Sequence, residues 1–189
     1  MPYIIFGSIL TVALFLILIY SHNKFVTQKT SIEGAWSGID IELKRRQDLI
    51  PNLVALTKGY ANFESSTLEA VASARYNAID SDNLTPSQRG EDENVLQDAL
   101  KGLLAIMESY PDLKASEEFL NLQTELTNTE DRIAAGRRFY NATVRMYEIR
   151  IVSFPSSIIA KLGGFTSNDF EFFQADSGDT EPIKVNLSS

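Results

Sequence analysis

The sequence predicts an all-α protein: an N-terminal transmembrane helix followed by an antiparallel bundle of long helices, four-helix and up-and-down in topology. Three observations carry this prediction. The first is an unbroken apolar run from Tyr3 to Tyr20. The second is the recurrence of apolar residues at spacings of three and four along most of the remaining chain, which is typical of helices that bury one face. The third is that no strand-like alternation follows the run.

The apolar run is the clearest single feature. At about 1.5 Å per residue it is about 27 Å long, close to the hydrocarbon thickness of a bilayer. Tyr3 and Tyr20 stand at its two ends, where amphipathic rings suit the membrane–water boundary. Leu10 and Phe15 lie inside it and are expected to face lipid. We therefore expect an anchor over residues 1–21 and a helical bundle over residues 22–173.

Two alternatives to an uncleaved anchor are less favoured. A signal peptide would have basic residues before the run and small residues at a cleavage site. The chain has neither, since it begins Met-Pro-Tyr and leaves the run through Ser21 and His22. A buried helix of a soluble protein would normally keep a polar face. The lysines after the run, Lys24 and Lys29, favour a cytoplasmic domain by the positive-inside rule, with the periplasmic side as the alternative.

The first helix after the anchor carries a heptad-like apolar stripe, which indicates burial against neighbouring helices. A second stripe, which includes Leu49 and Leu56, flanks it and favours burial on more than one side. Pro51 interrupts the helix and predicts a kink, not a stop, because the stripe resumes in register. The main stripe comprises Phe25, Ile32, Trp36, Ile39, Leu43, Ile50, Leu53 and Tyr60.

The rest of the chain divides into helices and one loop. The first helix either continues past residue 65 or a new one begins near Ser65. Residues 80–93 are rich in Asp, Ser, Asn, Pro and Gly, which predicts an exposed loop. We expect helices over residues 94–109, 116–153 and 156–162, the second of them capped by Ser116. The acidic tail, residues 174–189, is expected to be disordered.

Composition limits the function. A net charge of −8 argues against nucleic-acid binding. The absence of cysteine excludes disulfides and thiolate chemistry, and the single histidine, His22, cannot by itself form a histidine-based metal site. The sequence therefore predicts neither an enzyme nor a cofactor.

Charged residues on the apolar stripes are the candidate buried polar groups. Arg46 falls between Leu43 and Ile50 on the main stripe, whereas Lys44 and Arg45 are expected to be solvated. We expect Arg46 and Arg132 to pair with acidic residues across the bundle, and such residues serve the fold more often than chemistry. The candidate buried polar residues are Asp40, Arg46, Asp48 and Arg132, with Glu125 and Glu130 as further acidic partners.

The C-terminal segment 158–173 supplies more large apolar groups than a short extension needs, so it is the predicted docking surface. Its aromatic residues need an apolar surface, which could be the bundle itself or the bilayer. Its candidate interaction residues are Ile158, Ile159, Leu162, Phe165, Phe170 and Phe173.

Several motifs follow one another over nearly the whole chain: GAWSGIDIELKRRQDLIPNLV (34–54), KGYA (58–61), TLEAV (67–71), YPDLKA (110–115), FLNLQ (119–123), RFYN (138–141) and SFPS (153–156). In this order they resemble the LemA family. This resemblance implies a single-pass protein of the bacterial inner membrane with an antiparallel helical bundle. It implies no enzymatic activity, and it associates the chain with membrane organisation and membrane proteases. The chain departs from the family pattern at Tyr147-Glu148 and at residues 166–169, which replace a more basic segment.

Two functions follow from these observations. The favoured one is a non-enzymatic membrane scaffold or interaction module that self-associates or docks on other membrane proteins, such as a membrane protease. The alternative is a ligand-binding or enzymatic bundle with a pocket of carboxylates and arginines.

Overall fold

The computed structural model describes residues 2–59, 65–80 and 84–173, and these are helical throughout most of their length. The chain divides into two compact units. We call residues 1–38 with 138–171 the stem unit, and residues 39–137 with 172–189 the bundle unit. Two long helices, α1 (Pro2–Lys58) and α5 (Glu117–Val152), each contribute one part to each unit.

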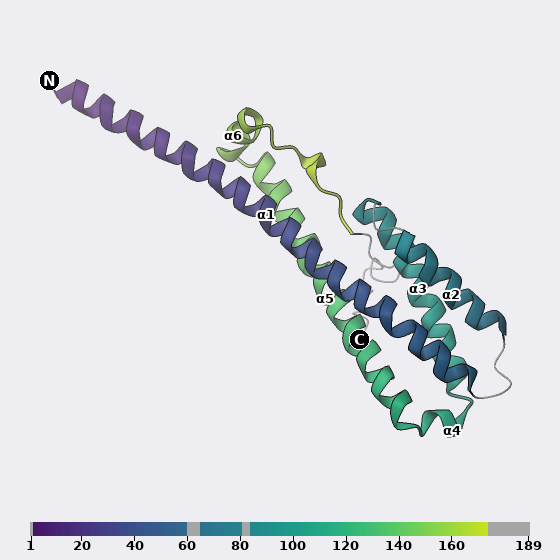
Figure 1. Ribbon diagram of the computed structural model, residues 1–189. Helices are drawn as coiled ribbons and strands as arrows, with labels where there is room; N and C mark the ends of the chain where they lie inside the picture. The colour runs from purple at the N-terminus through teal and green to yellow at the C-terminus, as the bar shows by residue number, and fades with distance from the viewer. Residues whose placement is uncertain (1, 60–64, 81–83, 174–189) are drawn as a thin grey trace, which may run out of the picture. The chain divides into compact units, whose positions relative to one another are not determined.

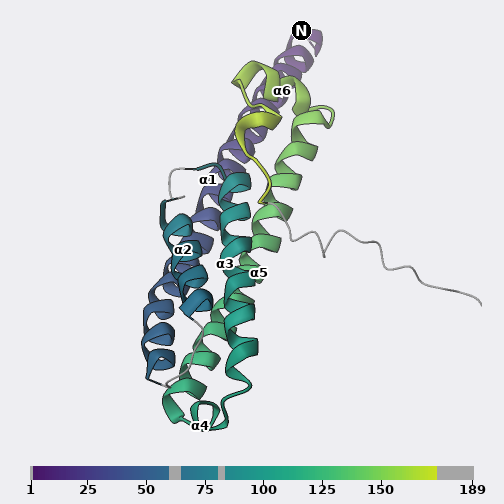
Figure 2. The ribbon, with the colours of Figure 1, turned by 90° about the vertical axis from the view of Figure 1, so that its right-hand side faces the viewer.

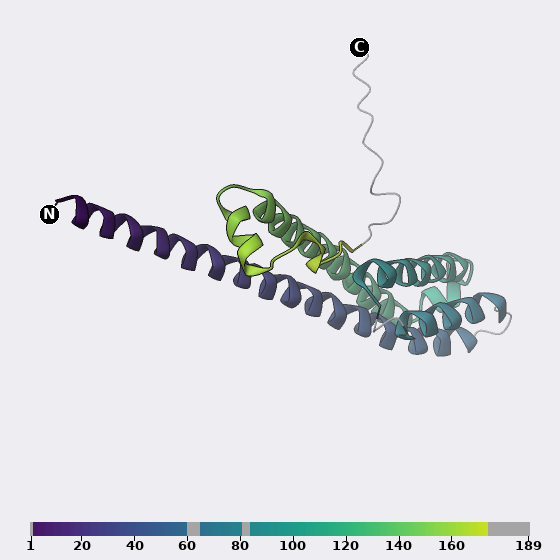
Figure 3. The same cartoon turned by 90° about the horizontal axis from the view of Figure 1, so that it is seen from above.

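The bundle unit contains four antiparallel helical segments, as the sequence predicts (Figures 1 and 3). They are the last third of α1 (residues 39–58), then α2 (Ser65–Asp80), α3 (Pro86–Met107) and the first part of α5 (residues 117–137). A short helix, α4 (Pro111–Lys114), joins α3 to α5. The core is apolar and draws on all of these elements: Ile50, Leu53, Leu68, Val71, Ala74, Ala78, Leu96, Leu100, Leu103, Met107, Leu113, Phe119 and Leu126.

The boundaries of most helices agree with the sequence. α1 continues through Pro51 and ends at Lys58, and a separate helix begins at Ser65. The oxygen of Ser116 accepts a hydrogen bond from the Phe119 amide at 3.2 Å, so Ser116 caps α5 as predicted. The predicted disordered tail lies outside the described residues.

The predicted loop over residues 80–93 is wrong in its second half, because α3 begins at Pro86. Thr85 caps this helix and forms a reciprocal capping box with Gln88, and Pro86 occupies the first helical position. These are strong helix-start signals. The polar composition of the segment concealed them, and the eight extra residues place Arg89 and Glu93 inside the bundle.

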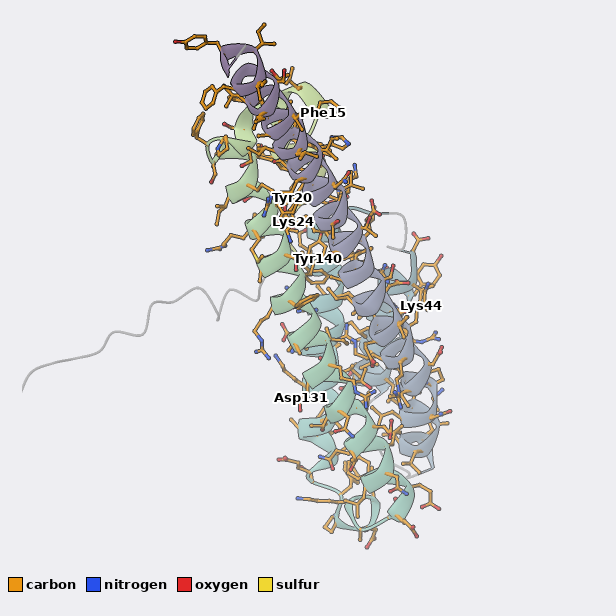
Figure 4. All side chains as sticks on the ribbon, turned by 90° about the vertical axis from the view of Figure 1, so that its left-hand side faces the viewer. Phe15, Tyr20, Lys24, Lys44, Asp131 and Tyr140 are labelled. Atoms are coloured by element: carbon orange, nitrogen blue, oxygen red, sulfur yellow. The ribbon has the colours of Figure 1, made fainter. Side chains whose placement is uncertain are left out.

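The stem unit pairs the first part of α1 with the last part of α5, and the chain then returns along this pair (Figure 2). α6 (Ser156–Gly163) follows α5 and ends at Gly164, whose φ of +72° is the left-handed conformation that favours glycine at a helix end. Residues 164–171, which we call the strap, run back over the helices. Figure 4 labels Tyr140 of α5, whose ring lies 5.5 Å from that of the half-buried Trp36.

Aromatic contacts hold the strap in place. Phe25 of α1 is fully buried, stacks on Phe165 with ring centroids 4.8 Å apart, and meets Tyr147 edge-on. Tyr147 also meets Phe170 edge-on, at 5.5 Å. Its hydroxyl donates a hydrogen bond to Asp169 at 2.7 Å, and burial together with this bond raises the pKa of Tyr147.

The segment 3–20 of α1 has a different environment from the remainder of the helix. All of its side chains are exposed, including Phe15 and Tyr20, which are labelled in Figure 4. Among the described residues, α1 is the one helix long and apolar enough to cross a membrane. An all-round apolar surface of this length is what a bilayer would cover.

Candidate functional site

A buried network of charges lies at the centre of the bundle unit. Arg46 of α1 and Glu93 of α3 are both completely buried, and their side chains form an ion pair. Arg46 also donates a hydrogen bond of 2.8 Å to Glu130 of α5. Gln47 donates to Glu93 at 3.3 Å and to the carbonyl oxygen of Ala78 in α2 at 3.2 Å. The network therefore joins all four helical segments of the bundle unit.

A second ion-pair group lies six residues, nearly two turns, earlier in α1. Asp40 accepts from Lys44 at 2.9 Å and pairs with Arg89 of α3 at 2.6 Å. Partial burial raises the pKa of Asp40, but the hydrogen bonds and charges of Lys44 and Arg89 outweigh this effect and hold the pKa below its usual value. This carboxylate is stabilised in its charged form.

Glu93 shows the opposite balance. Burial raises the pKa of Glu93 above its usual value, although the positive charges of Arg46, Arg89 and Arg137 act in the other direction. Removal of a carboxylate from water disfavours its charged form, so each of its partners matters for the stability of the folded state.

The ion pair at the centre of the network is closed to solvent, since Arg46 and Glu93 have no exposed side-chain surface. A groove of about 460 Å³ lies elsewhere on the bundle unit, lined by residues that do not include Arg46 or Glu93. Its lining comprises Asn52, Ala55, Leu56, Glu118, Asn121, Leu122 and Glu125. Among the described residues, no three acidic or histidine side chains are placed to hold a metal ion.

The predicted polar residues occupy three kinds of position. Arg46 is buried and paired, and one of its partners is the expected Glu130. Asp40 is partly buried. The prediction for Asp48 is wrong, because this residue is exposed. Two residues turn a helix by about 200°, so Asp48 points away from the face that Arg46 occupies.

Arg132 is also not buried. Its side chain is 54% exposed and lies 3.6 Å from Glu42 of α1, which the sequence analysis did not name as a partner. The neighbouring Ile133 takes the buried position on α5. The sequence also did not identify Glu93 as the buried partner of Arg46, because Glu93 falls in the predicted loop. The Thr85–Gln88 capping box was the signal that could have placed it on a helix.

The predicted docking residues are mostly covered by the chain itself. Ile159 and Phe173 are buried. Phe165 and Phe170 are half-buried against Phe25 and Tyr147, respectively. The prediction that these four form an exposed docking surface is therefore wrong, because aromatic rings so close to an apolar helix pair bury their area locally. Of the six predicted residues, Ile158 and Leu162 remain exposed.

An exposed apolar stripe on α5 was not anticipated. It runs along the stem-unit part of the helix, at spacings of three, four, three and three, on a face distinct from the buried residues Tyr140, Val144 and Tyr147. We call it the α5 stripe: Phe139, Ala142, Met146, Ile149 and Val152. The signal in the sequence was a second apolar period beside the first, which the more obvious core stripe obscured.

Comparison with known proteins identifies the family. The model of the LemA family matches residues 35–187 of this chain. The chain is similar to the magnetosome protein MamQ 1 of Paramagnetospirillum magneticum, with 28% identity over 205 residues that cover 95% of this chain and 75% of the relative. It is similar to MamQ of Magnetospirillum gryphiswaldense, with 27% identity covering 93% and 74%. It is also similar to the protein LemA of Metamycoplasma hominis, with 31% identity covering 81% and 70%.

The motifs quoted from the sequence, the helical fold and these matches agree with one another, and the match extends over most of the chain. The chain belongs to the LemA family.

Proposed function

We propose that this protein is a non-enzymatic membrane scaffold, anchored by the segment 3–20, that associates with further copies of itself through the α5 stripe. The observation that carries this proposal is the α5 stripe. The soluble part of a chain of this size rarely leaves a continuous row of large apolar side chains in water without a partner.

The spacing of the stripe favours a helix as its partner. Apolar side chains at intervals of three and four lie on one face of a helix and can pack against a similar row on a facing helix. Arg138 and Arg145 lie beside the stripe and are exposed, so polar groups border its apolar centre. A row of this kind resembles one half of a helix–helix interface.

Membrane anchoring favours a second copy as the source of that helix. Copies held in one membrane share the same orientation, and a two-fold axis along the membrane normal would bring α5 against α5. Confinement to the membrane also raises their effective concentration, so even a small interface would be occupied. Bacterial inner-membrane location, with the bundle unit in the cytoplasm, is part of this proposal and is supported by Lys24 and Lys29 after the span.

Disulfide cross-linking of the full-length protein tests the proposal directly, because the natural chain has no cysteine. Met146 is central in the stripe and 60% exposed. We expect M146C in membranes to form a disulfide-linked dimer under mild oxidation, since equivalent residues near a two-fold axis lie opposite each other.

The matched control is V95C on α3, which replaces an apolar residue with nearly the same exposure, 58%. It should remain monomeric under the same conditions. Equal cross-linking of both variants would indicate random collision in the membrane. Failure of M146C to cross-link, with only adducts to other membrane proteins, would replace self-association by docking on a different partner.

A further inference from the structure

A second exposed apolar cluster lies where α5 turns into α6. Phe154 is 83% exposed, Ile158 is 51% exposed and Leu162 is 79% exposed. They follow one another at intervals of four residues, whereas Ile159 and Ala160, on the other side of α6, are buried. α6 therefore has apolar residues on two sides, and only one of them faces the protein. We call Phe154, Ile158 and Leu162 the α6 corner.

Contacts within the stem unit hold the α6 corner at the end of the span. The ring of Phe165 lies 5.4 Å from the ring of His22. A methyl group on Gly163 would lie 3.5 Å from Nδ1 of the same histidine. His22 is two residues beyond Tyr20, or about 3 Å along the helix axis. Figures 1 and 2 both show α6 beside this part of α1.

The charges around the α6 corner suit a lipid surface. Between residues 151 and 168 the sequence contains one charged side chain, Lys161, and no carboxylate. This is unusual in a chain with a net charge of −8. Lys161 and Lys24 are both exposed. A lysine beside apolar residues can extend its ammonium group to lipid phosphates while its stem stays in the apolar layer.

We propose that the α6 corner lies in the interfacial layer of the bilayer that holds the span, as a second membrane contact formed by Phe154, Ile158 and Leu162 with Lys161 at its edge. This inference rests on the proposed anchoring of residues 3–20. The occupant of the corner is lipid because Gly163, the neighbour of Leu162, lies beside His22, which follows Tyr20 by two residues, where headgroups would surround the helix. The α5 stripe, by contrast, extends along the helix away from α6.

Such a contact would fix the tilt and the rotation of the stem unit relative to the membrane. A single span leaves a helix free to tilt and rotate about its axis. A second contact, on α6, restrains both motions and would keep the α5 stripe facing neighbouring copies. The same contact explains why three large apolar residues can remain uncovered by the protein.

The test places a fluorescent probe at single cysteines in the full-length protein. Variants F154C and L162C carry an environment-sensitive nitrobenzoxadiazole label, in vesicles of phosphatidylethanolamine and phosphatidylglycerol. L10C, within the span, reports anchoring, and V95C, on the bundle unit, reports exposure to water. We expect blue-shifted emission at residues 154 and 162 relative to residue 95, and quenching by spin-labelled lipid that is several-fold stronger than at residue 95.

The outcomes separate this inference from the proposed function. Quenching at L10C with none at F154C and L162C would overturn the lipid contact and leave the anchor intact. No quenching at L10C would overturn both. A blue shift at residue 162 without quenching by lipid would show that protein covers the corner, and it too would overturn the inference. Circular dichroism of each variant establishes that the helices are retained.

Discussion

Arg45 and Arg46 are neighbours in the sequence, yet their ion pairs contribute differently to the free energy of unfolding. Arg45 pairs with Glu125 at 2.7 Å, and both side chains are almost half exposed. Water competes for such a pair, so its contribution is about 0–1 kcal/mol. Arg46 is fully buried between Glu93 and Glu130. Loss of one member of a buried pair leaves an uncompensated charge and costs about 3–5 kcal/mol.

This contrast gives a prediction for neighbouring substitutions. R46M should lower the free energy of unfolding by about 3–5 kcal/mol, because Glu93 would remain buried without its main partner. R45M, the matched control, should lower it by less than about 1 kcal/mol. Urea unfolding followed by circular dichroism measures both. The double variant R46M/E93M should recover much of the loss, and equal effects of R45M and R46M would contradict the assignment of a buried network.

Asp40 predicts how stability depends on pH. Its pKa in the folded protein is below the unfolded value of 3.8, so the unfolded chain binds a proton at higher pH than the folded protein does. The stabilisation by Asp40 is therefore fully present above about pH 3.8 and is lost as the pH falls through the lower folded value. We expect D40N to unfold at lower urea than the natural chain at neutral pH.

The difference between D40N and the natural chain should shrink as the solution is acidified through this window. D98N is the control, because Asp98 pairs with Lys101 at 3.3 Å on the exposed surface of α3. Its midpoint should stay close to that of the natural chain throughout. A difference between D40N and the natural chain that does not change with pH would argue against a carboxylate stabilised by Arg89 and Lys44.

At the scale of elements, α5 carries two apolar faces with different purposes. In the bundle unit its core face includes Gly136, where a side-chain methyl would lie 3.0 Å from Cγ1 of Ile39. The glycine thus allows α1 and α5 to pack closely. In the stem unit the second face is the α5 stripe, which no element of the described chain covers.

Two glycine substitutions test the close approach. Alanine favours a helix over glycine by about 0.8–1 kcal/mol. G102A on α3, where a methyl would meet nothing within 4 Å, should therefore stabilise the protein by about that amount. G136A should gain less or destabilise, because Ile39 must move. Thermal unfolding of both variants measures the difference, and an equal gain at the two positions would mean that α1 and α5 do not need the glycine.

The whole molecule combines an apolar N-terminal segment with a helical bundle and an exposed apolar row on α5. Glutamates within this row should weaken self-association. We expect M146E/I149E to raise the apparent dissociation constant of the dimer at least about tenfold, since burial of each apolar side chain contributes about 1.5–3 kcal/mol. Mass photometry of nanodisc samples provides the measurement. V95E is the control and should leave the mass distribution unchanged, and insensitivity to M146E/I149E would refute the α5 interface.

Sequence periodicity was sufficient for the helices and for the burial of Arg46, because a helix repeats every 3.6 residues and a residue on an apolar stripe faces the core. It was not sufficient for Arg132, whose position lies beside the buried Ile133 and not on the core face. Nor could it separate residues 86–93 from a loop, since the polar residues of these first two turns of α3 resemble loop composition. The feature that distinguishes this segment from a loop is the capping box of Thr85 and Gln88, which involves only two side chains.

The apolar N-terminal segment, the helical pattern and the family could all be predicted from the sequence, because each depends on the order and spacing of residues along the chain. Only the tertiary structure decided which charges meet. Glu93 pairs with Arg46 across 47 positions of chain, a distance over which local periodicity carries no information. The tertiary structure also decided which apolar groups remain in solvent. Phe165 and Phe154 are equally apolar, but the turn at Gly163-Gly164 brings one against Phe25 and leaves the other uncovered.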